Sequence, residues 1–595
     1  MNDNVGSTKE IFDNEAASVK IIISEMISAG NFEVAQQLLE QYALINPADP
    51  EINEIRKVLY PEDIENTENN SIPEAFGVLK DIETIFVLNR IIFGRIGIQD
   101  TVLRKVKLME DVWNYRPLIL TCYHNINQRQ AHMWLQTSGD GKVTMSANTR
   151  LLNVYEYFQK SYAEGLENKA VYKKADDGKH YIETGENIYD VFDGDTLVRQ
   201  EYYTGYVGSL RMVRTYERGK KINDHIYDDW GYLNCIREYD PTDDNIYSVK
   251  YYTTDGLLCL EAFYDHLNEE RDEPDKLVVY NDYGSIVKTC ANRSELASLC
   301  LESIMPEDKF CIIFIEDGLL SKTATALSIN KTKRAICEIV HNVFLRDPYN
   351  LESEPQRFYK NLCENNSAFD GIVLLTEAAK KDFQYLYGDK QNIFAIPHFY
   401  PFIVDKVDFN SRDHNKAVIV ARLDPIKQLE NAIYIFSLVV KEVPDARLEI
   451  YGRGDEEKVL KELIYKLRMQ NNIFLMGLTD DPVSVLQTAS LFIMTSLVEG
   501  YPSTLFESIC NGCPAFSYDI KYGPSEIIID EKTGFLFHRS DRESFSKKII
   551  TYLNDVELQR AMIENCYNDA PRFSPERFMD RWYDMTKTLY ERRKI

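Results

Sequence analysis

The sequence predicts an α/β protein with two doubly wound, Rossmann-like domains. Three observations predict this fold class. Apolar strand-like runs alternate with helical segments in two separate stretches of the chain, which is typical of parallel sheets. The chain has 595 residues, which is too many for one hydrophobic core. A long Tyr- and Thr-rich region inside the first stretch alternates polar with apolar residues, which indicates an antiparallel insertion.

The N-terminal region, residues 1–60, is predicted to be a short helical hairpin of the tetratricopeptide type. One amphipathic face runs through Ile22 and Met26, and a second runs through Leu38 and Tyr42. A single repeat cannot bury its own apolar face, so we expect it to dock onto the rest of the chain. The polar, acidic residues 61–80 are predicted to be a linker.

The first Rossmann-like domain is predicted over residues 81–396. Each of its strands is a short apolar run followed by a turn, and most are followed by a helix. The strands are expected at 84–88, 117–123, 311–315, 335–340 and 371–375.

An antiparallel β-meander is predicted at about 165–290, inserted in this first domain. Turn tetrads end at Gly231, Gly256 and Gly284, and these glycines lie 25 and 28 residues apart. Each tetrad separates two strand-like runs, which is the pattern of consecutive hairpins. The meander is either a platform for a substrate or a surface for a second copy or a sister subunit.

The second Rossmann-like domain is predicted over residues 397–574, beginning with a hinge that ends at 415. An amphipathic helix with Phe578 and Trp582 on one face follows at 575–595. The strands of this second domain are expected at 416–421, 447–451, 473–476, 491–495 and 515–518.

The composition excludes several classes of protein. A net charge of −26 argues against a nucleic-acid binder, whose affinity comes from Lys and Arg. No apolar run approaches the length of a membrane-spanning helix, and the first residues lack the apolar core of a signal peptide. We therefore expect a cytoplasmic protein with at most peripheral contact to the inner face of a membrane. Cys510 and Cys513 form the one close pair among 11 cysteines, and no metal site is expected.

Two cations and a helix start are predicted to form an anion site in the second domain. Arg422 and Lys427 follow its first strand, at the edge of the sheet where ligands bind in open α/β folds. Their charges can both reach one diphosphate. A helix starts near Thr504, and the backbone amides of Ser503, Thr504 and Leu505 can point at the same anion.

Two carboxylates and several glycines complete this constellation. Glu499 precedes the helix and Glu507 lies about one turn inside it, so the two can accept hydrogen bonds from hydroxyl groups at two points of one ligand. Gly452 and Gly454 permit close approach of the backbone after the second strand. Each piece alone is a weak signal, and the order at consecutive strand ends carries the prediction.

Residues 416–540 resemble the donor domain of the retaining glycosyltransferases of family four, which have the GT-B fold. The pattern consists of Arg422-x4-Lys427, Tyr451-Gly-x-Gly454 and Glu499-x7-Glu507. The segment 518–525 (YDIKYGPS) and the inserted meander look like the bacterial enzymes that glycosylate wall teichoic acid, the poly-polyol-phosphate α-glycosyltransferases. The accessory-secretion glycosyltransferases of serine-rich adhesins share the insertion and are the nearest alternative.

The resemblance implies a role for each matching residue. Arg422 and Lys427 would neutralise the donor diphosphate as it leaves, Glu507 would hold the ribose, and Glu499 would contact the transferred sugar. Backbone at Gly477 and Leu478 would meet the uracil. His341 follows a strand of the first domain, where the family has a histidine near the anomeric carbon.

One loop departs from the family pattern. The first strand is usually followed by two adjacent glycines that contact the phosphate, whereas this chain has Gly94 and Gly97. Gly97 is the expected substitute. A catalytically silent partner subunit, which would explain the altered loop, is the alternative from another functional class.

The predicted function is retaining transfer of a hexose or N-acetylhexosamine from a UDP-sugar to a bacterial cell-surface polymer such as wall teichoic acid. The alternative acceptor is Ser or Thr of a serine-rich adhesin. No cofactor or metal is expected, because two cations and a helix end supply the charge at the diphosphate. Five cations are candidates for a phosphate-polymer path in the first domain: Arg90, Arg95, Lys331, Lys333 and Arg334.

Overall fold

The computed structural model describes most of the chain from residue 74 onward. The described residues are 74–91, 98–125, 135, 145–146, 149–161, 169, 177–204, 209–228, 230–265, 273–327, 333–388, 392–401 and 405–594. The predicted hairpin at 1–60 and the first part of the predicted linker therefore lie outside the described residues.

The described residues form two compact units. The first contains the residues up to Glu307 together with 326–327, and the second contains 308–325 and the residues from Lys333 on. The second unit thus includes later strands of the first predicted Rossmann-like domain. The C-terminal helix α19 (Pro575–Lys594) packs on two of these strands, which accounts for the grouping. The boundary at 397 remains a prediction.

The first sheet has seven strands in the order β17-β16-β15-β14-β1-β2-β3. Parallel pairing joins β1 to β2 and β3, and it joins β14 through β15 and β16 to β17. The strands are β1 (Ile82–Leu88), β2 (Leu118–Thr121), β3 (Arg150–Asn153), β14 (Phe310–Ile315), β15 (Arg334–Val340), β16 (Gly371–Leu374) and β17 (Asn392–Ala395). Every residue of β1 and β15 is buried, as expected of central strands in a parallel sheet.

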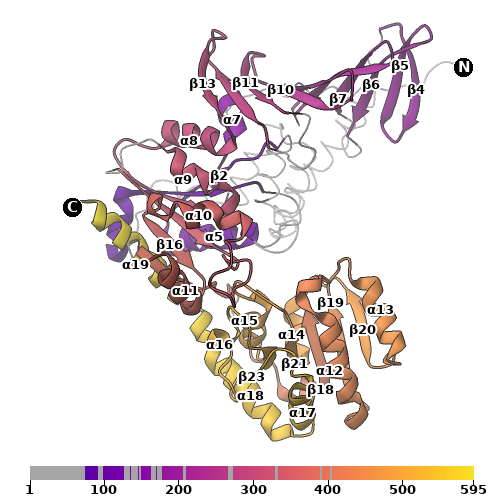
Figure 1. Ribbon diagram of the computed structural model, residues 1–595, viewed down its shortest axis with the longest axis vertical. Helices are drawn as coiled ribbons and strands as arrows, with labels where there is room; N and C mark the ends of the chain where they lie inside the picture. Colours follow the sequence, from indigo (N-terminus) through magenta and orange to yellow (C-terminus); the bar gives the residue numbers. More distant parts are fainter. Residues whose placement is uncertain are drawn as a thin grey trace, which may run out of the picture. The chain divides into compact units, whose positions relative to one another are not determined.

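Helices flank the strands of this first sheet (Figure 1). In the first unit these are α5 (Ile98–Trp113), α7 (Val154–Gln159) and α8 (Arg293–Ile304). In the second unit they are α9 (Lys322–Ala326), α10 (Lys360–Glu364), α11 (Glu377–Tyr387) and α19. The aromatic ring of Trp582 on α19 lies 4.9 Å from that of Phe314 on β14, so the predicted apolar face of the last helix is confirmed as a packing face.

Residues 74–81 differ from the predicted linker. They form a 3-10 helix in which Leu79 is buried, and Phe76 packs its ring 5.3 Å from that of Trp113 on α5. Apolar residues spaced along this short segment are enough to dock it onto the domain, although the surrounding sequence is acidic.

The predicted meander is present as a ten-stranded antiparallel sheet in sequential order. Gly231, Gly256 and Gly284 all have positive φ, between 74° and 81°, so the three predicted turn tetrads are confirmed as turns. The strands are β4 (His180–Gly185), β5 (Ile188–Asp193), β6 (Thr196–Tyr203), β7 (Leu210–Glu217), β8 (Lys220–Tyr227), β9 (Leu233–Tyr239), β10 (Ile246–Tyr252), β11 (Leu258–Phe263), β12 (Lys276–Tyr280) and β13 (Ile286–Cys290).

The third sheet, in the second unit, has six parallel strands in the order β20-β19-β18-β21-β22-β23. The strands are β18 (Asp413–Val420), β19 (Arg447–Tyr451), β20 (Ile473–Gly477), β21 (Ala489–Met494), β22 (Ala515–Tyr518) and β23 (Gly534–Phe537). The helices are α12 (Leu429–Glu442), α13 (Glu457–Lys466), α14 (Pro482–Thr488), α15 (Ser503–Cys510), α16 (Pro524–Ile527), α17 (Arg542–Leu553) and α18 (Val556–Asp569).

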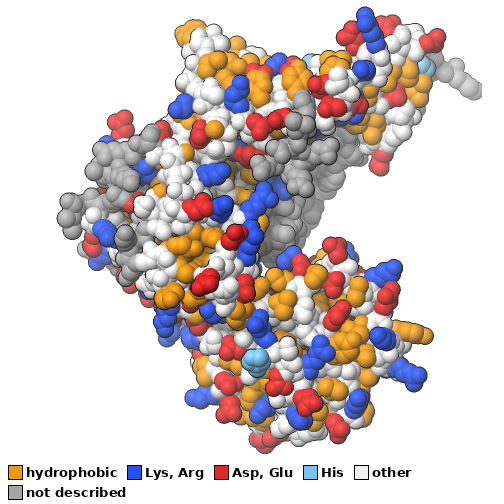
Figure 2. All heavy atoms as spheres, in the orientation of Figure 1, with side chains coloured by type: hydrophobic (Ala, Val, Ile, Leu, Met, Phe, Trp, Pro, Cys, Tyr) orange, Lys and Arg blue, Asp and Glu red, His pale blue; other side chains and the backbone are white. Residues whose placement is uncertain are grey.

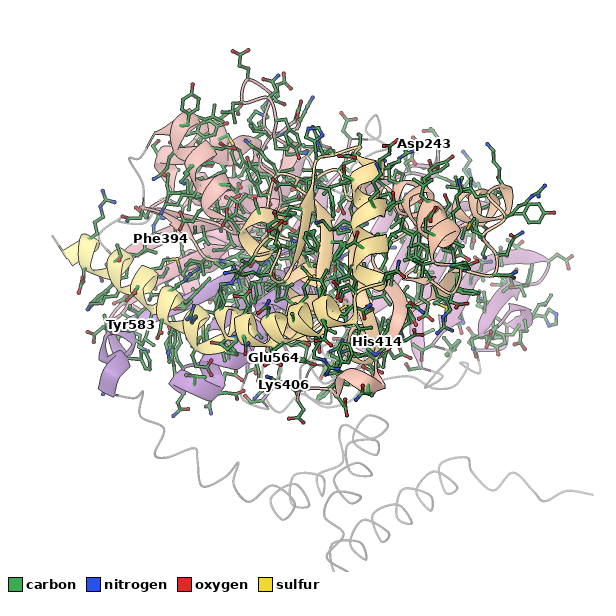
Figure 3. The ribbon with its side chains drawn as sticks, turned by 90° about the horizontal axis from the view of Figure 1, so that it is seen from below. Asp243, Phe394, Lys406, His414, Glu564 and Tyr583 are labelled. Atoms are coloured by element: carbon green, nitrogen blue, oxygen red, sulfur yellow. The ribbon has the colours of Figure 1, made fainter. Side chains whose placement is uncertain are left out.

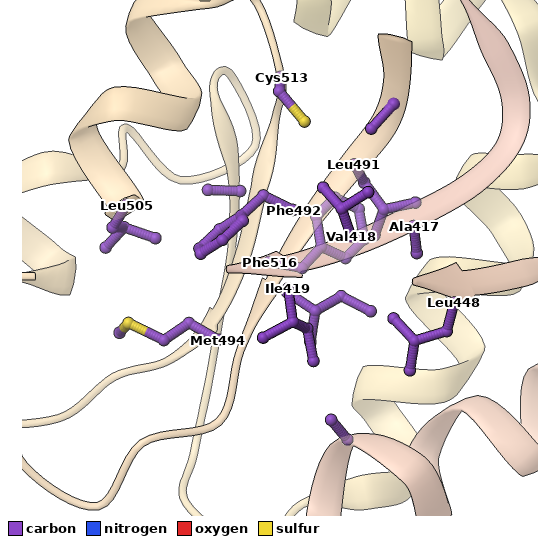
Figure 4. Packing of buried hydrophobic residues seen from close by; sticks show 14 of the residues in the cluster. Ala417, Val418, Ile419, Leu448, Leu491, Phe492, Met494, Leu505, Cys513 and Phe516 are labelled. Carbon is purple, nitrogen blue, oxygen red and sulfur yellow. The ribbon is translucent and has the colours of Figure 1, made fainter. Parts of the chain in front are cut away.

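The core of this sheet holds the strand ends in place. Side chains of its two central strands, among them Val418 and Phe492, share one buried apolar cluster with Leu505 from α15 (Figure 4). Before β18, Lys406 donates to Glu564 of α18 at 2.6 Å, and the two side chains lie beside each other in Figure 3. A rigid sheet therefore fixes the position of each loop that follows a strand.

Three surface and chemical features complete the description. Side chains of Lys and Arg are interspersed with those of Asp and Glu over the face shown in Figure 2.

No helix of the described residues is both long and apolar enough to cross a membrane. The 11 cysteines are buried free thiols, including Cys510 at the end of α15 and Cys513 before β22, so this pair is packed core.

Candidate donor site

The candidate site lies at the carboxyl edge of the third sheet, where the loops after β18, β19, β20 and β21 meet. The side chain of Arg422, in the first loop, is 72% exposed and lies 3.3 Å from the carboxylate of Asp424. Asp424 also accepts a hydrogen bond from the amide of Ile426, which caps the short 3-10 turn that leads to Lys427. The turn thus places one exposed guanidinium and one mostly buried ammonium at the carboxyl edge of the sheet.

Lys427 and Glu499 form an ion pair at this edge of the sheet. The ammonium nitrogen of Lys427 donates to Glu499 at 2.6 Å, and both side chains are mostly buried. The backbone holds the pair together, because Thr495 donates to the carbonyl of Lys427 and the amide of Leu497 donates to that of Ile426. The two predicted residues, 72 positions apart, are therefore neighbours.

Gly452 and Gly454 support the Arg422 loop. A Cβ at Gly452 would lie 1.8 Å from the carbonyl oxygen of Ala421, and one at Gly454 would lie 2.3 Å from that of Leu423. The amide of Leu423 in turn donates to the carbonyl of Arg453. The close approach predicted from these glycines exists in the structure, and the approaching group is the chain's own first loop.

Helix α15 begins at the same edge of the sheet. Ser503 is exposed and Thr504 is partly exposed, and as the first residues of the helix their amides have no partner within it. The amide of Leu505 already donates to the carbonyl of Pro502, and its side chain is in the core. Ser503 and Thr504 are therefore the amides suited to an anion, and Glu507 follows one turn later.

The loop after β20 has open space beside it. Gly477 has a φ of 77°, and no atom lies within 4 Å of the place where a Cβ would stand. Leu478 is 65% exposed and Met476 is 47% exposed, and two apolar side chains of neighbouring loops, Ile426 and Leu497, are also exposed. A flat aromatic base fits an exposed apolar rim of this kind.

His341 follows β15 and is held by a buried carboxylate. Its Nε2 lies 2.7 Å from Glu316, the residue after the neighbouring strand β14, and Glu316 is fully buried. Its ring stacks on that of His398 at 5.6 Å. Sequence reasoning missed Glu316, although it occupies the same position after β14 that His341 occupies after β15.

The loop that carries Glu499 contacts the His341 strand end directly. A Cβ at Gly500 would lie 2.3 Å from the carbonyl oxygen of His341 and 2.7 Å from the Cα of Asn342. Within the second unit, the structure thus brings the predicted catalytic residues His341, Glu499 and Lys427 to one place.

A further buried acid lies beneath this region. Glu338, on β15, accepts hydrogen bonds from Ser321 at 2.5 and 2.6 Å. Burial raises the pKa of Glu338 well above its usual value, and the nearby carboxylate of Asp317 adds to the effect. We assign Glu338 a structural role, because it is enclosed in the sheet.

Asp382 on α11 anchors the segment next to Glu499. Its carboxylate accepts from the ammonium of Lys521 at 2.6 Å and from the hydroxyl of Tyr522 at 2.8 Å. The amide of Tyr522 donates to the carbonyl of Glu499 at 2.8 Å. Sequence reasoning missed Asp382, since nothing in its own helix distinguishes it from a surface acid.

Gly97 and the predicted phosphate-polymer path are not among the residues that the structure brings to this site. Gly97 lies outside the described residues, as do Arg95 and Lys331 of the predicted phosphate path. Arg334 is buried, and Lys333 and Arg334 stand at the start of β15, whereas His341 follows its end. The part of that path predicted at Arg334 is therefore wrong, because a buried arginine at this end of the strand cannot line a polymer groove.

The chain is similar in sequence to known glycosyltransferases. Residues 404–569 match the family model of glycosyl transferases group 1. The chain is 25% identical over 512 residues to the poly(glycerol-phosphate) alpha-glucosyltransferase of Bacillus subtilis (strain 168), a match that covers 85% of this chain and 75% of that protein.

Two further similarities point the same way. The chain is 25% identical over 403 residues to the GtfA subunit of the UDP-N-acetylglucosamine–peptide N-acetylglucosaminyltransferase of Streptococcus gordonii, which covers 64% of this chain and 74% of that subunit. The solved structure of a mutant of S. aureus TarM in complex with fondaparinux, alpha-GlcNAc-glycerol and UDP has a TM-score of 0.70, at 19% identity over 85% of this chain and 99% of that chain.

These similarities confirm the resemblance predicted from the sequence, both to teichoic-acid glycosyltransferases and to accessory-secretion glycosyltransferases. The parallel sheets and the structural likeness also confirm the GT-B fold. The predicted insertion is confirmed by the ten-stranded antiparallel sheet between β3 and β14.

Proposed function

We propose that this chain is a glycosyltransferase that moves a hexose or N-acetylhexosamine from a UDP-sugar to a polyol-phosphate polymer of the bacterial surface, such as wall teichoic acid. The observation that carries the proposal is the meeting of Lys427, Glu499 and the start of α15 at one edge of the sheet, with Arg422 beside them. The similarity to the poly(glycerol-phosphate) alpha-glucosyltransferase supports the choice of acceptor.

In this proposal the donor diphosphate binds to Arg422, Lys427 and the amides of Ser503 and Thr504. Lys427 exchanges Glu499 for a phosphate oxygen when the donor enters, which frees Glu499 to accept hydrogen bonds from the sugar. Glu507 holds the ribose hydroxyls, and the uracil lies against the exposed rim at Gly477 and Leu478. Positive charge at the leaving diphosphate stabilises the transition state, so no metal ion is needed for that purpose.

We further propose that the transfer retains the configuration at the anomeric carbon. The C–O bond to the diphosphate breaks as the acceptor hydroxyl approaches the same face, and the leaving phosphate oxygen takes the proton of that hydroxyl. The backbone of His341 contacts Gly500, which follows Glu499 in the chain. The hydrogen bond between His341 and Glu316 fixes the orientation of the imidazole ring. A ring fixed in this way can hold a sugar hydroxyl near the reacting carbon.

The alternative acceptor is Ser or Thr of an adhesin, and the similarity to the peptide N-acetylglucosaminyltransferase subunit favours it. The donor chemistry is the same for both acceptors. Labelled UDP-glucose and UDP-N-acetylglucosamine, each offered with poly(glycerol phosphate) and with a serine-rich peptide, separate the two. Transfer to the polymer supports the proposal, and transfer to the peptide alone supports the alternative.

A catalytically silent partner subunit is tested by UDP binding. The proposal predicts that UDP raises the melting temperature of the wild-type protein and that Lys427→Ala abolishes the shift. The absence of both UDP stabilisation and donor turnover in the wild-type protein would refute the proposal and support the silent role.

A further inference from the structure

A cavity of about 630 Å³ opens in the first unit, between the first sheet and the meander. Arg90 follows β1, and Tyr123 and His124 follow β2, so one wall is formed by the carboxyl ends of two parallel strands. The other wall comes from the meander and includes Arg237 on β9 and Tyr251 on β10. Carboxyl ends of parallel strands are the usual ligand-binding edge of such sheets, and this volume suits a small ligand.

Arg293 is a buried polar side chain in the lining of the cavity. The side chain of Arg293 is only 6% exposed and pairs with Glu273 at 2.8 Å. Its guanidinium also lies over the ring of Tyr123, 4.4 Å from the ring centre, and donates to the hydroxyl of Tyr155 at 3.3 Å. Arg293 is therefore fixed in place and its charge is neutralised, so it presents a planar edge with hydrogen-bond donors.

Aromatic rings form a second fixed surface. The ring of His124 lies 4.9 Å from that of Tyr251 and 5.3 Å from that of Tyr155. Its Nε2 lies 2.6 Å from the amide oxygen of Asn234. Burial lowers the pKa of His124 to about 4, so the ring is neutral at pH 7. Neutral rings packed edge-to-face and tilted against one another offer apolar surface on which the C–H side of a sugar or polyol packs.

Charges of both signs line the cavity, from three arginines and four acids. Glu273 pairs with Arg293, Asp244 lies 3.6 Å from Lys221, and Asp275 accepts from the amide of Asp265. Arg90 and Arg237 make no ion pair with any residue that the structure describes. A cavity with both signs of charge and many fixed donors and acceptors favours a ligand rich in hydroxyl groups with little net charge.

We infer that this cavity binds one polyhydroxylated unit of the acceptor, either a polyol of its backbone or a sugar attached to it. The inference rests on the proposed function for the identity of the acceptor. It assigns the meander a direct role, because β9 and β10 supply one wall. In this inference the carboxylates accept hydrogen bonds from ligand hydroxyl groups, and Arg237 and Arg293 donate to ligand oxygens. The rings of His124 and Tyr251 pack against the C–H groups of the ligand.

The test is ligand-observed NMR on the full-length protein with saturating UDP, which occupies the donor site. The probes are glycerophosphoglycerol for the polymer backbone, methyl α-glucoside for an attached sugar, and inorganic phosphate as a simple anion. We expect saturable binding of at least one polyhydroxylated probe, weakened about tenfold by Arg237→Gln through loss of a charged donor. Lys288→Gln, which removes the same charge from the exposed face of β13, should leave the affinity unchanged.

The two organic probes separate the two sources of hydroxyl groups, and binding of either supports the inference. Three results would overturn it: neither organic probe binds, phosphate alone binds with the same dependence on Arg237, or Lys288→Gln weakens binding as much as Arg237→Gln. UDP stabilisation is measured on the same samples and depends on the second unit. Its loss in the wild-type protein would count against the proposed function and leave the result for the cavity intact.

Discussion

Gly500 and His341 are in backbone contact, so close that a Cβ at residue 500 would lie 2.3 Å from the carbonyl oxygen of His341. The contact joins the loop of Glu499 to the strand end of His341. Any side chain at residue 500 must push these two groups apart. The absence of a side chain at Gly500 is therefore a requirement of the site geometry.

Gly500→Ala is accordingly expected to lower kcat/KM roughly 100-fold, the cost of misplacing reacting groups by about 1 Å. Overpacking should reduce the free energy of unfolding by about 1–3 kcal/mol. Steady-state kinetics and urea titration measure the two effects. Gly77→Ala is the control, because its Cβ would meet open space. Unchanged kinetics in Gly500→Ala would contradict the proposed role of this contact.

Lys427→Ala should lower kcat/KM about 10²–10³-fold, by analogy with the loss of one donor to a developing anion. The ammonium is proposed to stabilise the leaving diphosphate, and its removal also leaves the mostly buried Glu499 without its partner. Turnover of labelled donor with saturating acceptor measures the effect. Lys441→Ala, at the exposed end of α12, should behave as wild type. Equal loss in both variants would point to general destabilisation.

Asp382→Ala should lower kcat about tenfold with little change in UDP affinity. Asp382 holds Lys521 and Tyr522, and the amide of Tyr522 holds the carbonyl of Glu499, so its loss frees Glu499 to move. The expected size is that of one lost hydrogen bond to a charged group. Asp382→Asn keeps one acceptor oxygen and should recover part of kcat.

The control for Asp382 is Glu377→Gln, which changes the same charge on the same helix at an exposed side chain. A merely structural role for Asp382 would lower the melting temperature and leave kcat per folded molecule unchanged. That outcome would remove Asp382 from the site.

His124 should make the protein less stable in mild acid. Burial holds its folded pKa at about 4, below the ordinary 6.5, while Asn234 opposes the shift and Arg237 and Arg293 add to it. Between these values the unfolded chain binds the extra proton, so the free energy of unfolding falls as the pH drops from about 6.5 to about 4. The loss is at most about 3 kcal/mol.

His124→Gln removes this titration and keeps a group that can bond to Asn234. The difference in unfolding free energy between the wild type and the variant, from urea titrations at pH 7 and pH 5, should therefore change in favour of the variant at pH 5. A difference that does not vary with pH would show that the pKa of His124 in the folded protein equals that in the unfolded chain.

Chelation of divalent metals should leave donor turnover within about twofold of the untreated rate, because cations of the chain and a helix end are proposed to hold the diphosphate. Turnover is measured in EDTA and again after addition of Mg²⁺ or Mn²⁺. A loss of activity in EDTA that Mn²⁺ restores would overturn metal-independent transfer.

Most of the second domain could be predicted from sequence because its strands are short apolar runs between clear turns. The runs at 447–451 and 515–518 match β19 and β22 residue for residue. The strand at Arg150–Asn153 was missed, since a four-residue segment with an exposed Arg150 carries almost no periodicity. Ten strands of the meander were reduced to three hairpins because only three of its turns carry the Asp-x-x-Gly or related pattern.

The site residues could be named from motif order, but their contacts could not. Sequence gives no sign that Lys427 donates to Glu499, since 72 residues separate them. The glycines at 452 and 454 predicted a close approach, and only the fold shows that the approaching groups are the carbonyls of Ala421 and Leu423. Glu316 becomes visible once β14 and β15 are known to be neighbours.

The Lys427–Glu499 pair gives the proposed donor site an internal counter-ion. An incoming anion does not meet a bare cation, since it must displace an internal carboxylate that is already in place. A ligand with a single weakly held anionic group gains little from that exchange, whereas a diphosphate that engages Arg422 and the start of α15 at the same time can complete it. In the proposed donor site, this exchange would select ligands by their number of anionic groups, independently of the base and the sugar.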